Sequence, residues 1–415
     1  MFQCLLPFKW HGENQKREKG EKMKILSKLK KLTIIQETYK LLFTLVGLLP
    51  ADRKLVMFES YLGKQYSCNP RAIYEYMRVN KPEYKLYWSI DSRYTETFKE
   101  LDIPYIKRFS IKWLFCMARA GYWVTNSRMP LWIPKPKHTV YLQTWHGTPL
   151  KRLAQDMKEV HMPGTNTEAY KEEFYRESRN WDFLISPNAY STEIFRRAFQ
   201  YDKQILETGY PRNDMLLSPE KERLAQEIKR KLKLPMHKKV VLYAPTWRDN
   251  QYYEKGRYKF DVQLDLKEMQ RELGEDYVIL LRMHYLVAEN LDLKPFHGFA
   301  YDCSNYVDIR DLYLISDLLI TDYSSVFFDF ANLWRPILFY VYDIEIYRGE
   351  LRGFYFDLEK NAPGPLVTTT VEIIDYIKTL DLDTHNNQDY QKFHDHFCHF
   401  ETGESTRKVV GSVFN

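Results

Sequence analysis

Short runs of apolar residues alternate along most of the chain with longer stretches in which apolar residues recur at helical spacing. The runs predict buried β-strands, and the recurring positions predict helices packed against them. The alternation begins after Pro50, is interrupted by a charged helical stretch at residues 214–239, and then resumes. Strands and helices that alternate in two blocks predict two α/β domains with mostly parallel sheets.

In the first block we predict strands at Lys54–Glu59, Tyr84–Ile90, Pro104–Lys107, Gly121–Thr125, Thr139–Thr144, Trp181–Ile185 and Ile205–Thr208, and helices at Arg71–Val79 and Ser191–Phe199. In the second block we predict strands at Lys239–Tyr243, Tyr277–Arg282, Leu318–Thr321 and Pro336–Tyr340, and helices at Leu264–Leu273, Asp308–Ile315 and Ser325–Leu333. Ligands bind to such sheets at the carboxyl ends of the strands. The residues that follow each strand are therefore the candidates for a functional site.

These patterns divide the chain into four predicted segments. Residues 1–50 form a basic N-terminal arm and helix, and residues 51–235 form the first α/β domain. Residues 236–390 form the second α/β domain, with a linker that ends near Pro235. Residues 391–415 form a C-terminal helical segment that could pack back on the first domain.

Basic residues are concentrated near the N-terminus. The chain carries a net charge of +6, and residues 16–31 alone hold eight Lys or Arg against two Glu. The rest of the chain is therefore neutral overall, which argues against a nucleic-acid-binding protein. In residues 24–49, apolar residues recur at helical spacing between lysines. This pattern is typical of a helix on an anionic membrane surface. It is equally typical of a helix that packs on the protein with its lysines in water.

The composition indicates in which cellular compartment the protein works. Its five cysteines are far apart and form no pair with the spacing of a zinc site, so we expect reduced thiols and a cytosolic protein. The longest apolar run, Leu41–Leu49, is too short to cross a membrane, and no secretory signal is recognisable. Aromatic residues make up 16% of the chain. They would suit stacking on sugars or bases, and also contacts between domains.

A histidine follows the predicted strand Thr139–Thr144, in the segment QTWHGTPLK at Gln143–Lys151. Gly147 would let the backbone turn closely past a ligand. Near neutral pH, a histidine such as His146 can remove a proton from a hydroxyl group. A core histidine at a turn is the plainer interpretation.

Three strand ends of the second block also carry polar residues. Arg248 could bind phosphate oxygens. Arg282 and His284 are two residues apart, so in an extended chain they lie on the same face and could bind phosphate together. The hydroxyl-rich turn Thr321–Ser325 leads into a predicted helix, whose free N–H groups could bind phosphate. Each has a plainer interpretation. Arg248 could belong to a structural turn, Arg282 and His284 to a surface strand end, and Ser324 or Ser325 could simply cap the helix. Neither a P-loop nor a dinucleotide-binding glycine motif occurs.

Four segments together are similar to one known family. They are QTWHGTPLKRLA at Gln143–Ala154, APTWR at Ala244–Arg248, RMH at Arg282–His284 and TDYSSVFFDF at Thr321–Phe330. This combination resembles the CDP-glycerol glycerophosphotransferases, which are the bacterial teichoic acid primases and polymerases. Phe58–Pro70 and Gly209–Asp214 also resemble segments of that family. The resemblance spans about residues 54–400, in the same order along the chain.

The resemblance implies a GT-B type fold, in which two Rossmann-like domains face a central cleft. It implies transfer of an alditol phosphate from its CDP ester to a hydroxyl group, with release of CMP. His146 would be the base, and His284 with Arg282 would hold the diphosphate and stabilise the leaving CMP. The other implied donor or phosphate contacts are Thr321, Asp322, Ser324, Ser325, Arg248, Arg212, Asn213 and Asp317. The implied acceptor-side residues are Gly147, Thr148, Lys151 and Asn69.

The resemblance also implies partners and a location. The donor would be CDP-glycerol or CDP-ribitol, since no residue decides between them, and no metal or other cofactor is expected. The acceptor would be an undecaprenyl-diphosphate-linked saccharide or a glycerophosphate chain. The enzyme would lie at the cytoplasmic face of the cell membrane as a peripheral protein that binds no nucleic acid, and it could form homo-oligomers.

Two other functions remain open at this point. One is a GT-B glycosyltransferase that uses a nucleotide sugar. The other is a non-enzymatic scaffold on the membrane with an inactive site. The presence of His146, His284 and Arg282 argues against the scaffold, because an inactive site need not keep them.

Overall fold

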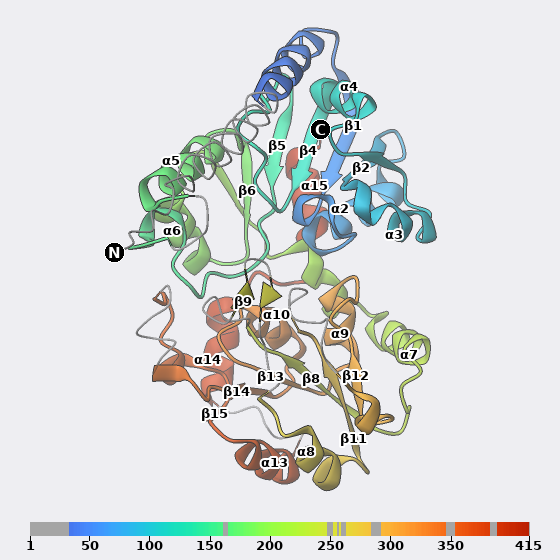
Figure 1. Ribbon diagram of the computed structural model, residues 1–415, viewed down its shortest axis with the longest axis vertical. Coiled ribbons are helices and arrows are strands. Elements are labelled where there is room, and N and C mark those ends of the chain that lie inside the picture. The colour runs from blue at the N-terminus through green and yellow to red at the C-terminus, as the bar shows by residue number, and fades with distance from the viewer. Residues whose placement is uncertain are drawn as a thin grey trace, which may run out of the picture.

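The computed structural model describes residues 33–160, 165–246, 252–254, 257–258, 263–283, 292–345, 353–381 and 388–414. Two parallel sheets lie in separate halves of the molecule, one above the other in the view of Figure 1. The predicted α/β class with two parallel sheets is therefore confirmed.

The first sheet has seven strands in the order β3-β2-β1-β4-β5-β6-β7. They are β1 (Asp52–Glu59), β2 (Lys85–Ile90), β3 (Tyr105–Lys107), β4 (Ala120–Thr125), β5 (Val140–Gln143), β6 (Phe183–Ser186) and β7 (Gln204–Glu207). The last five residues of the central strand β1 are all buried. Its apolar run is continuous because both faces of a parallel sheet are covered.

The helices of this half are α2 (Cys68–Asn80), α3 (Thr95–Glu100), α4 (Ile111–Arg119), α5 (Thr167–Ser178) and α6 (Ala189–Ala198), with the 3₁₀ turns η1 (Tyr61–Gly63), η2 (Ser92–Tyr94), η3 (Ala154–Asp156) and η4 (Pro211–Leu216). Trp88, Trp113, Trp123 and Trp181 are fully buried in its core. Much of the aromatic content therefore serves packing.

The second sheet has six strands in the order β12-β11-β8-β13-β14-β15. They are β8 (Lys239–Ala244), β11 (Tyr277–Leu281), β12 (Ala300–Asp302), β13 (Leu318–Thr321), β14 (Ile337–Tyr340) and β15 (Leu366–Val367). Its flanking elements are α7 (Lys221–Lys231), α8 (Leu266–Leu273), α9 (Ile309–Ile315), α10 (Val326–Phe330), α12 (Leu358–Asn361), α13 (Thr370–Thr379), η6 (Lys294–Phe296) and η7 (Ala331–Leu333). A small antiparallel pair, β9 (Tyr252–Glu254) and β10 (Arg257–Tyr258), lies outside both sheets.

The chain ends by crossing back to the first half. Helix α14 (Gln388–Phe397) packs in the second core through Tyr390, Phe393 and Phe397. The predicted boundary at residue 390 therefore falls inside this helix, whose apolar face packs on Phe327 and Phe328 of α10. Helix α15 (Ser405–Val413) packs in the first core. Phe414, which follows it, lies 4.6 Å from the ring of Tyr122 between ring centres.

A helix over residues 33–46 lies beside α4 at the edge of the first half (Figure 1). Phe43 is fully buried between Trp113 and Trp123, and the Tyr39 hydroxyl donates to the Ser110 carbonyl at 3.3 Å. The other face of this helix exposes leucine and isoleucine side chains. Among the described residues, no helix is long and apolar enough to span a bilayer. The basic segment at residues 1–32 lies outside the described residues.

Candidate functional site

His146 lies in the sharp turn that follows β5, at the carboxyl edge of the first sheet. The turn is made by Trp145, whose φ of 50° is in the left-handed region, and the indole stacks on the histidine ring at 4.7 Å. The buried side chain of Gln143 stabilises this backbone. It accepts from the Trp145 N–H at 3.0 Å and donates to the Ser127 carbonyl at 3.2 Å. The histidine is thus held on a rigid turn.

The ring of His146 makes one hydrogen bond within the described residues, at 2.8 Å between Nδ1 and the carbonyl oxygen of Asn126. A carbonyl can only accept, so Nδ1 carries the proton and Nε2 keeps its lone pair. Burial lowers the pKa of His146 to about 4, and the nearby Arg212 lowers it further, against the hydrogen bond to Asn126. The ring is therefore neutral at pH 7 and can accept a proton at Nε2.

Two side chains hold the backbone on either side of His146. Asn69 donates from Nδ2 to the carbonyls of Thr144 and Trp145, at 3.0 and 3.2 Å. Arg212 donates to the carbonyl of His146 at 2.8 Å and forms an ion pair of 2.6 Å with Asp329. Because Asp329 lies in α10 of the second half, Arg212 connects the histidine turn to the other domain.

The histidine turn touches the hydroxyl-rich turn that precedes α10. A Cβ atom built on Gly147 would lie 2.9 Å from the Ser325 Oγ, so a larger residue here would force the serine side chain to move. Ser324 and Ser325 are half-buried, and neither hydroxyl has a hydrogen-bond partner within the described part of the chain. The two residues are thus available to a ligand beside His146.

Thr321 and Asp322 anchor this turn to the end of strand β8. Both are buried, and their side chains bond to the end of β8. Thr321 donates to the Ala244 carbonyl at 2.8 Å, and Asp322 accepts from the Thr246 N–H at 2.7 Å. They hold the turn in place, whereas Ser324 and Ser325 are half-buried.

Comparison with known proteins decides the family. Residues 41–415 match the model of the family described as CDP-Glycerol:Poly(glycerophosphate) glycerophosphotransferase. The chain belongs to this family.

Individual relatives agree with this assignment. The chain is 63% identical to the teichoic acid poly(glycerol phosphate) polymerase of Bacillus subtilis (strain 168), covering 95% of this chain and 54% of that protein. It therefore spans about half the length of that relative. It is 45% identical to the teichoic acid glycerol-phosphate transferase of Staphylococcus aureus (strain NCTC 8325 / PS 47), covering 94% of this chain and 100% of that protein.

A solved structure supports the GT-B type arrangement. The wall teichoic acid polymerase TagF superposes with a TM-score of 0.83 and 43% sequence identity, covering 95% of this chain and 97% of that one. In this chain, as the resemblance implied, two parallel α/β sheets meet at the carboxyl ends of their strands.

Arg282 follows β11 and is half-buried. Its guanidinium donates to the carbonyls of Cys303 and Ser304, the former at 2.9 Å. Burial lowers its pKa, although Asp308 raises it. His284 and Arg248, the other two cationic candidates of the second domain, lie outside the described residues. Their predicted phosphate contacts stay predictions.

Asp317 is not part of this site. It precedes β13, whereas the hydroxyl-rich turn follows that strand, so the two are separated by roughly 13 Å at about 3.3 Å per residue. Its carboxylate accepts from the Val240 N–H at 2.7 Å. The resemblance implied a donor contact at Asp317, but strand β13 separates it from Thr321, so the two lie at opposite edges of the sheet.

The remaining candidates lie close to the histidine turn. Asn213 is buried and donates to Asp329 at 3.1 Å and to Glu401 at 2.9 Å. It therefore supports the ion pair between Arg212 and Asp329, and we call these three residues the interdomain frame. Thr148 is buried, and Lys151 is half-buried and pairs with Phe354 of the second domain through an isolated β-bridge.

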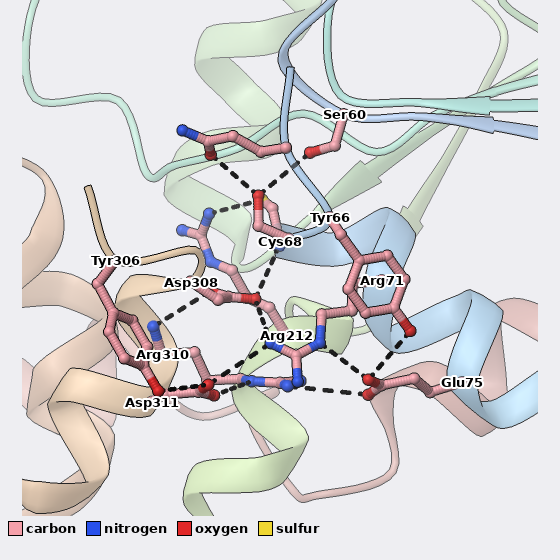
Figure 2. Close-up of polar contacts among 12 residues, drawn as sticks. Ser60, Tyr66, Cys68, Arg71, Glu75, Arg212, Tyr306, Asp308, Arg310 and Asp311 are labelled. Atoms are coloured by element: carbon pink, nitrogen blue, oxygen red, sulfur yellow. Dashed lines mark hydrogen bonds and ion pairs between the residues drawn. The ribbon is translucent and has the colours of Figure 1, made fainter. Parts of the chain in front are cut away.

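A second contact between the domains lies beside the interdomain frame. Figure 2 shows Arg71 and Glu75 of α2 facing Asp308, Arg310 and Asp311 of the second domain. Arg71 lies 3.3 Å from Asp308 and 3.6 Å from Asp311, and Arg310 lies 3.7 Å from Glu75. Burial would raise the pKa of Asp308, but Arg310 and Arg71 bring it below its ordinary value. These charges help to fix the domain arrangement that places Gly147 on Ser325.

Sequence reasoning missed Asn126, Gln143 as a support, and Asp329. The signal for Asn126 was its position directly after the predicted strand Gly121–Thr125. Within the described residues, no cluster of three or more histidine, cysteine or acidic side chains has the geometry to hold a metal ion.

Proposed function

We propose that the chain transfers glycerol phosphate from CDP-glycerol to a hydroxyl group of a lipid-linked acceptor, releasing CMP, in teichoic acid synthesis at the cytoplasmic face of the cell membrane. The acceptor would be a glycerophosphate chain or an undecaprenyl-diphosphate-linked saccharide. The observation that carries the proposal is a neutral His146, with no hydrogen-bond partner at Nε2 among the described residues, on a turn that meets Ser325 across the domain contact. Family membership and relatives named for glycerol phosphate support glycerol as the alditol.

The proposed step is an in-line displacement at the β-phosphorus of the donor. Nε2 of His146 takes the proton of the acceptor hydroxyl while its oxygen forms a bond to that phosphorus. The bond from the phosphorus to the bridging oxygen breaks, and the electron pair leaves with CMP. Ser324, Ser325 and Arg282 would bind phosphate oxygens. Positioning and charge stabilisation contribute most of the rate enhancement in such reactions.

A donor screen tests the proposal. The purified chain is incubated with a lipid-like glycerophosphate acceptor and CDP-glycerol, CDP-ribitol or UDP-sugars, with and without EDTA. We expect CMP release with CDP-glycerol in both buffers, and a product that is heavier by one glycerol phosphate unit in the mass spectrum. Faster release from CDP-ribitol would reassign the alditol. Release of UDP and never of CMP would point to a glycosyltransferase and overturn the proposal.

The exposed apolar residues near the N-terminus support the membrane part of the proposal. Ile34, Ile35, Leu41, Leu42 and Leu45 on the helix at residues 33–46 are 48–66% exposed, and Ile111 and Phe115 on the adjacent α4 are 78% and 45% exposed. The same helix buries Phe43 in the core. One face therefore attaches the helix to the protein, while the other offers leucine and isoleucine to a bilayer.

We expect the double substitution Leu41→Ser and Leu45→Ser to weaken sedimentation with anionic liposomes while sparing turnover of a soluble acceptor. Substitution is preferable to deletion of residues 1–49, because loss of Phe43 would open the core. Val79→Ser, at a 78% exposed position on α2, is the matched control and should sediment like the wild type. Unchanged sedimentation of the double variant would reject this surface as the membrane contact.

A further inference from the structure

Asn126 is fully buried directly after β4, and its side chain connects it to the turn that follows β1. Its Oδ1 accepts from the Tyr61 N–H at 2.8 Å, and its Nδ2 donates to the Ser60 Oγ at 3.0 Å. Its own carbonyl oxygen is the partner of the His146 Nδ1. One residue thus joins the ends of β1, β4 and β5.

We propose that Asn126 is a positioning residue whose side-chain contacts with Ser60 and Tyr61 fix its carbonyl where it holds His146 as the Nδ1–H tautomer. The role rests on His146 acting as the base in the proposed function. In a neutral imidazole, only the nitrogen without the proton can accept one, and the hydrogen bond at one nitrogen decides which it is. Asn126 would therefore direct the basic nitrogen, Nε2, to the acceptor.

The other supports of the histidine turn cannot do this. Gln143, Asn69 and Arg212 bond to backbone atoms of residues 144–146. Within the described residues, the Asn126 carbonyl is the one group hydrogen-bonded to a ring nitrogen of His146. Backbone placement and tautomer choice are therefore assigned to different residues.

The turn that Asn126 holds is strained, which explains why a side chain is needed. Tyr61 and Leu62 have φ values of 47° and 62°, in the left-handed region that non-glycine residues seldom adopt, and Gly63 follows at 80°. Such conformations persist where surrounding contacts enforce them. The Tyr61 ring lies 5.8 Å from the His146 ring, so relaxation of this turn would reach the histidine.

The test compares Asn126→Ala with wild type in two measurements. Long-range ¹H–¹⁵N NMR of protein labelled at the histidine nitrogens reports the tautomer without substrate, and the His146 signal is identified by its loss in His146→Gln. We expect the wild type as Nδ1–H and Asn126→Ala with a substantial Nε2–H population. We also expect kcat to fall by about 10–10³-fold, while KM for the donor changes much less. The loss of kcat should be smaller than the roughly 10⁴-fold loss that follows when a catalytic histidine is held entirely in the wrong tautomer.

Asn188 provides the matched control. It is also fully buried after a strand of the same sheet, and its side chain bonds to the Phe397 carbonyl and the Ser191 N–H. Asn188→Ala should lower stability by a similar mechanism while leaving the His146 tautomer and kcat unchanged. A change of tautomer in both variants would mean that general loosening of the domain is the cause, and would overturn the proposal.

Wild-type tautomer and kcat in Asn126→Ala would likewise overturn it. If that variant does not fold, Ser60→Ala decides the matter, since it removes the bond to Ser60 with little change in volume and leaves those from Tyr61 and Ser127. A raised Nε2–H population in Ser60→Ala supports the role, and an unchanged spectrum rejects it. Because the spectra need no substrate, the tautomer result stands even if no CDP donor releases CMP.

Discussion

His146→Ala is expected to lose about 10²–10⁴-fold in turnover, the usual contribution of a general base, while CDP-glycerol binds with nearly unchanged affinity. The histidine lies on the first domain, whereas Ser324, Ser325 and Arg282, which would bind the donor phosphates, lie on the second, so its loss removes the base and leaves these contacts. CMP release at saturating substrate measures turnover, and calorimetry measures donor binding.

His138 is a suitable control for that substitution. It is half-buried in the same domain and precedes β5, whereas His146 follows it, so the two lie toward opposite edges of the sheet. His138→Ala should therefore retain turnover. Near-normal turnover in His146→Ala would show that another group takes the proton.

The pH profile of the wild type follows from the same residue. A base must be unprotonated, and burial lowers the pKa of His146 to about 4. We therefore expect kcat to stay level as the pH falls through 6.5, the ordinary pKa of histidine, and to decline only near pH 4. An acid limb near 6.5 would contradict burial of the ring in the working enzyme.

Arg212→Ala is expected to lower the free energy of unfolding by about 3–5 kcal/mol, the cost of leaving one partner of a buried ion pair alone. The side chains of Arg212 and Asp329 are only 8% and 7% exposed, so water cannot replace the missing guanidinium. Turnover should fall as well, because the His146 carbonyl loses its donor. Urea denaturation measures the first effect and CMP release the second.

A double-mutant cycle separates the ion pair from other effects of the substitution. Adding Asp329→Asn to Arg212→Ala removes the unpaired charge and should restore part of the stability without restoring turnover. Arg223, whose ion pairs with Glu220 and Glu227 lie in water, is the control, and Arg223→Ala should leave the urea midpoint nearly unchanged. Additive losses in the cycle would contradict a coupled Arg212–Asp329 pair.

Most strands could be predicted from the sequence, because buried parallel strands are continuous apolar runs. Helices α4 and α5 were missed for opposite reasons. In α4 the exposed positions Ile111 and Phe115 are themselves apolar, which erases the contrast between the two faces. In α5 the only buried apolar residue is Phe174, so the helix looks like a charged loop.

The candidate site was only partly predictable. His146 and the Thr321–Ser325 turn could be paired because each follows a strand of its own sheet, and ligands of two-domain α/β proteins bind at the carboxyl ends of strands, often between the domains. The interdomain frame could not be predicted, because Arg212 and Asp329 are 117 residues apart and no local pattern joins them. Asn126 acts on His146 through a carbonyl oxygen, which every residue type possesses, so its identity gives no direct signal.

The return of α15 to the first domain has a consequence for folding. Val409, Val410, Val413 and Phe414 complete a core whose first strand begins at Asp52, and Asp214 bonds to the backbone of Ser405 and Thr406. During synthesis on the ribosome, the first domain cannot close its core until the whole second domain has been made. Contacts so distant in sequence form slowly. We therefore expect nascent chains that stop before residue 405 to remain sensitive to protease in the first domain, while the second domain, whose core ends with α14, becomes resistant.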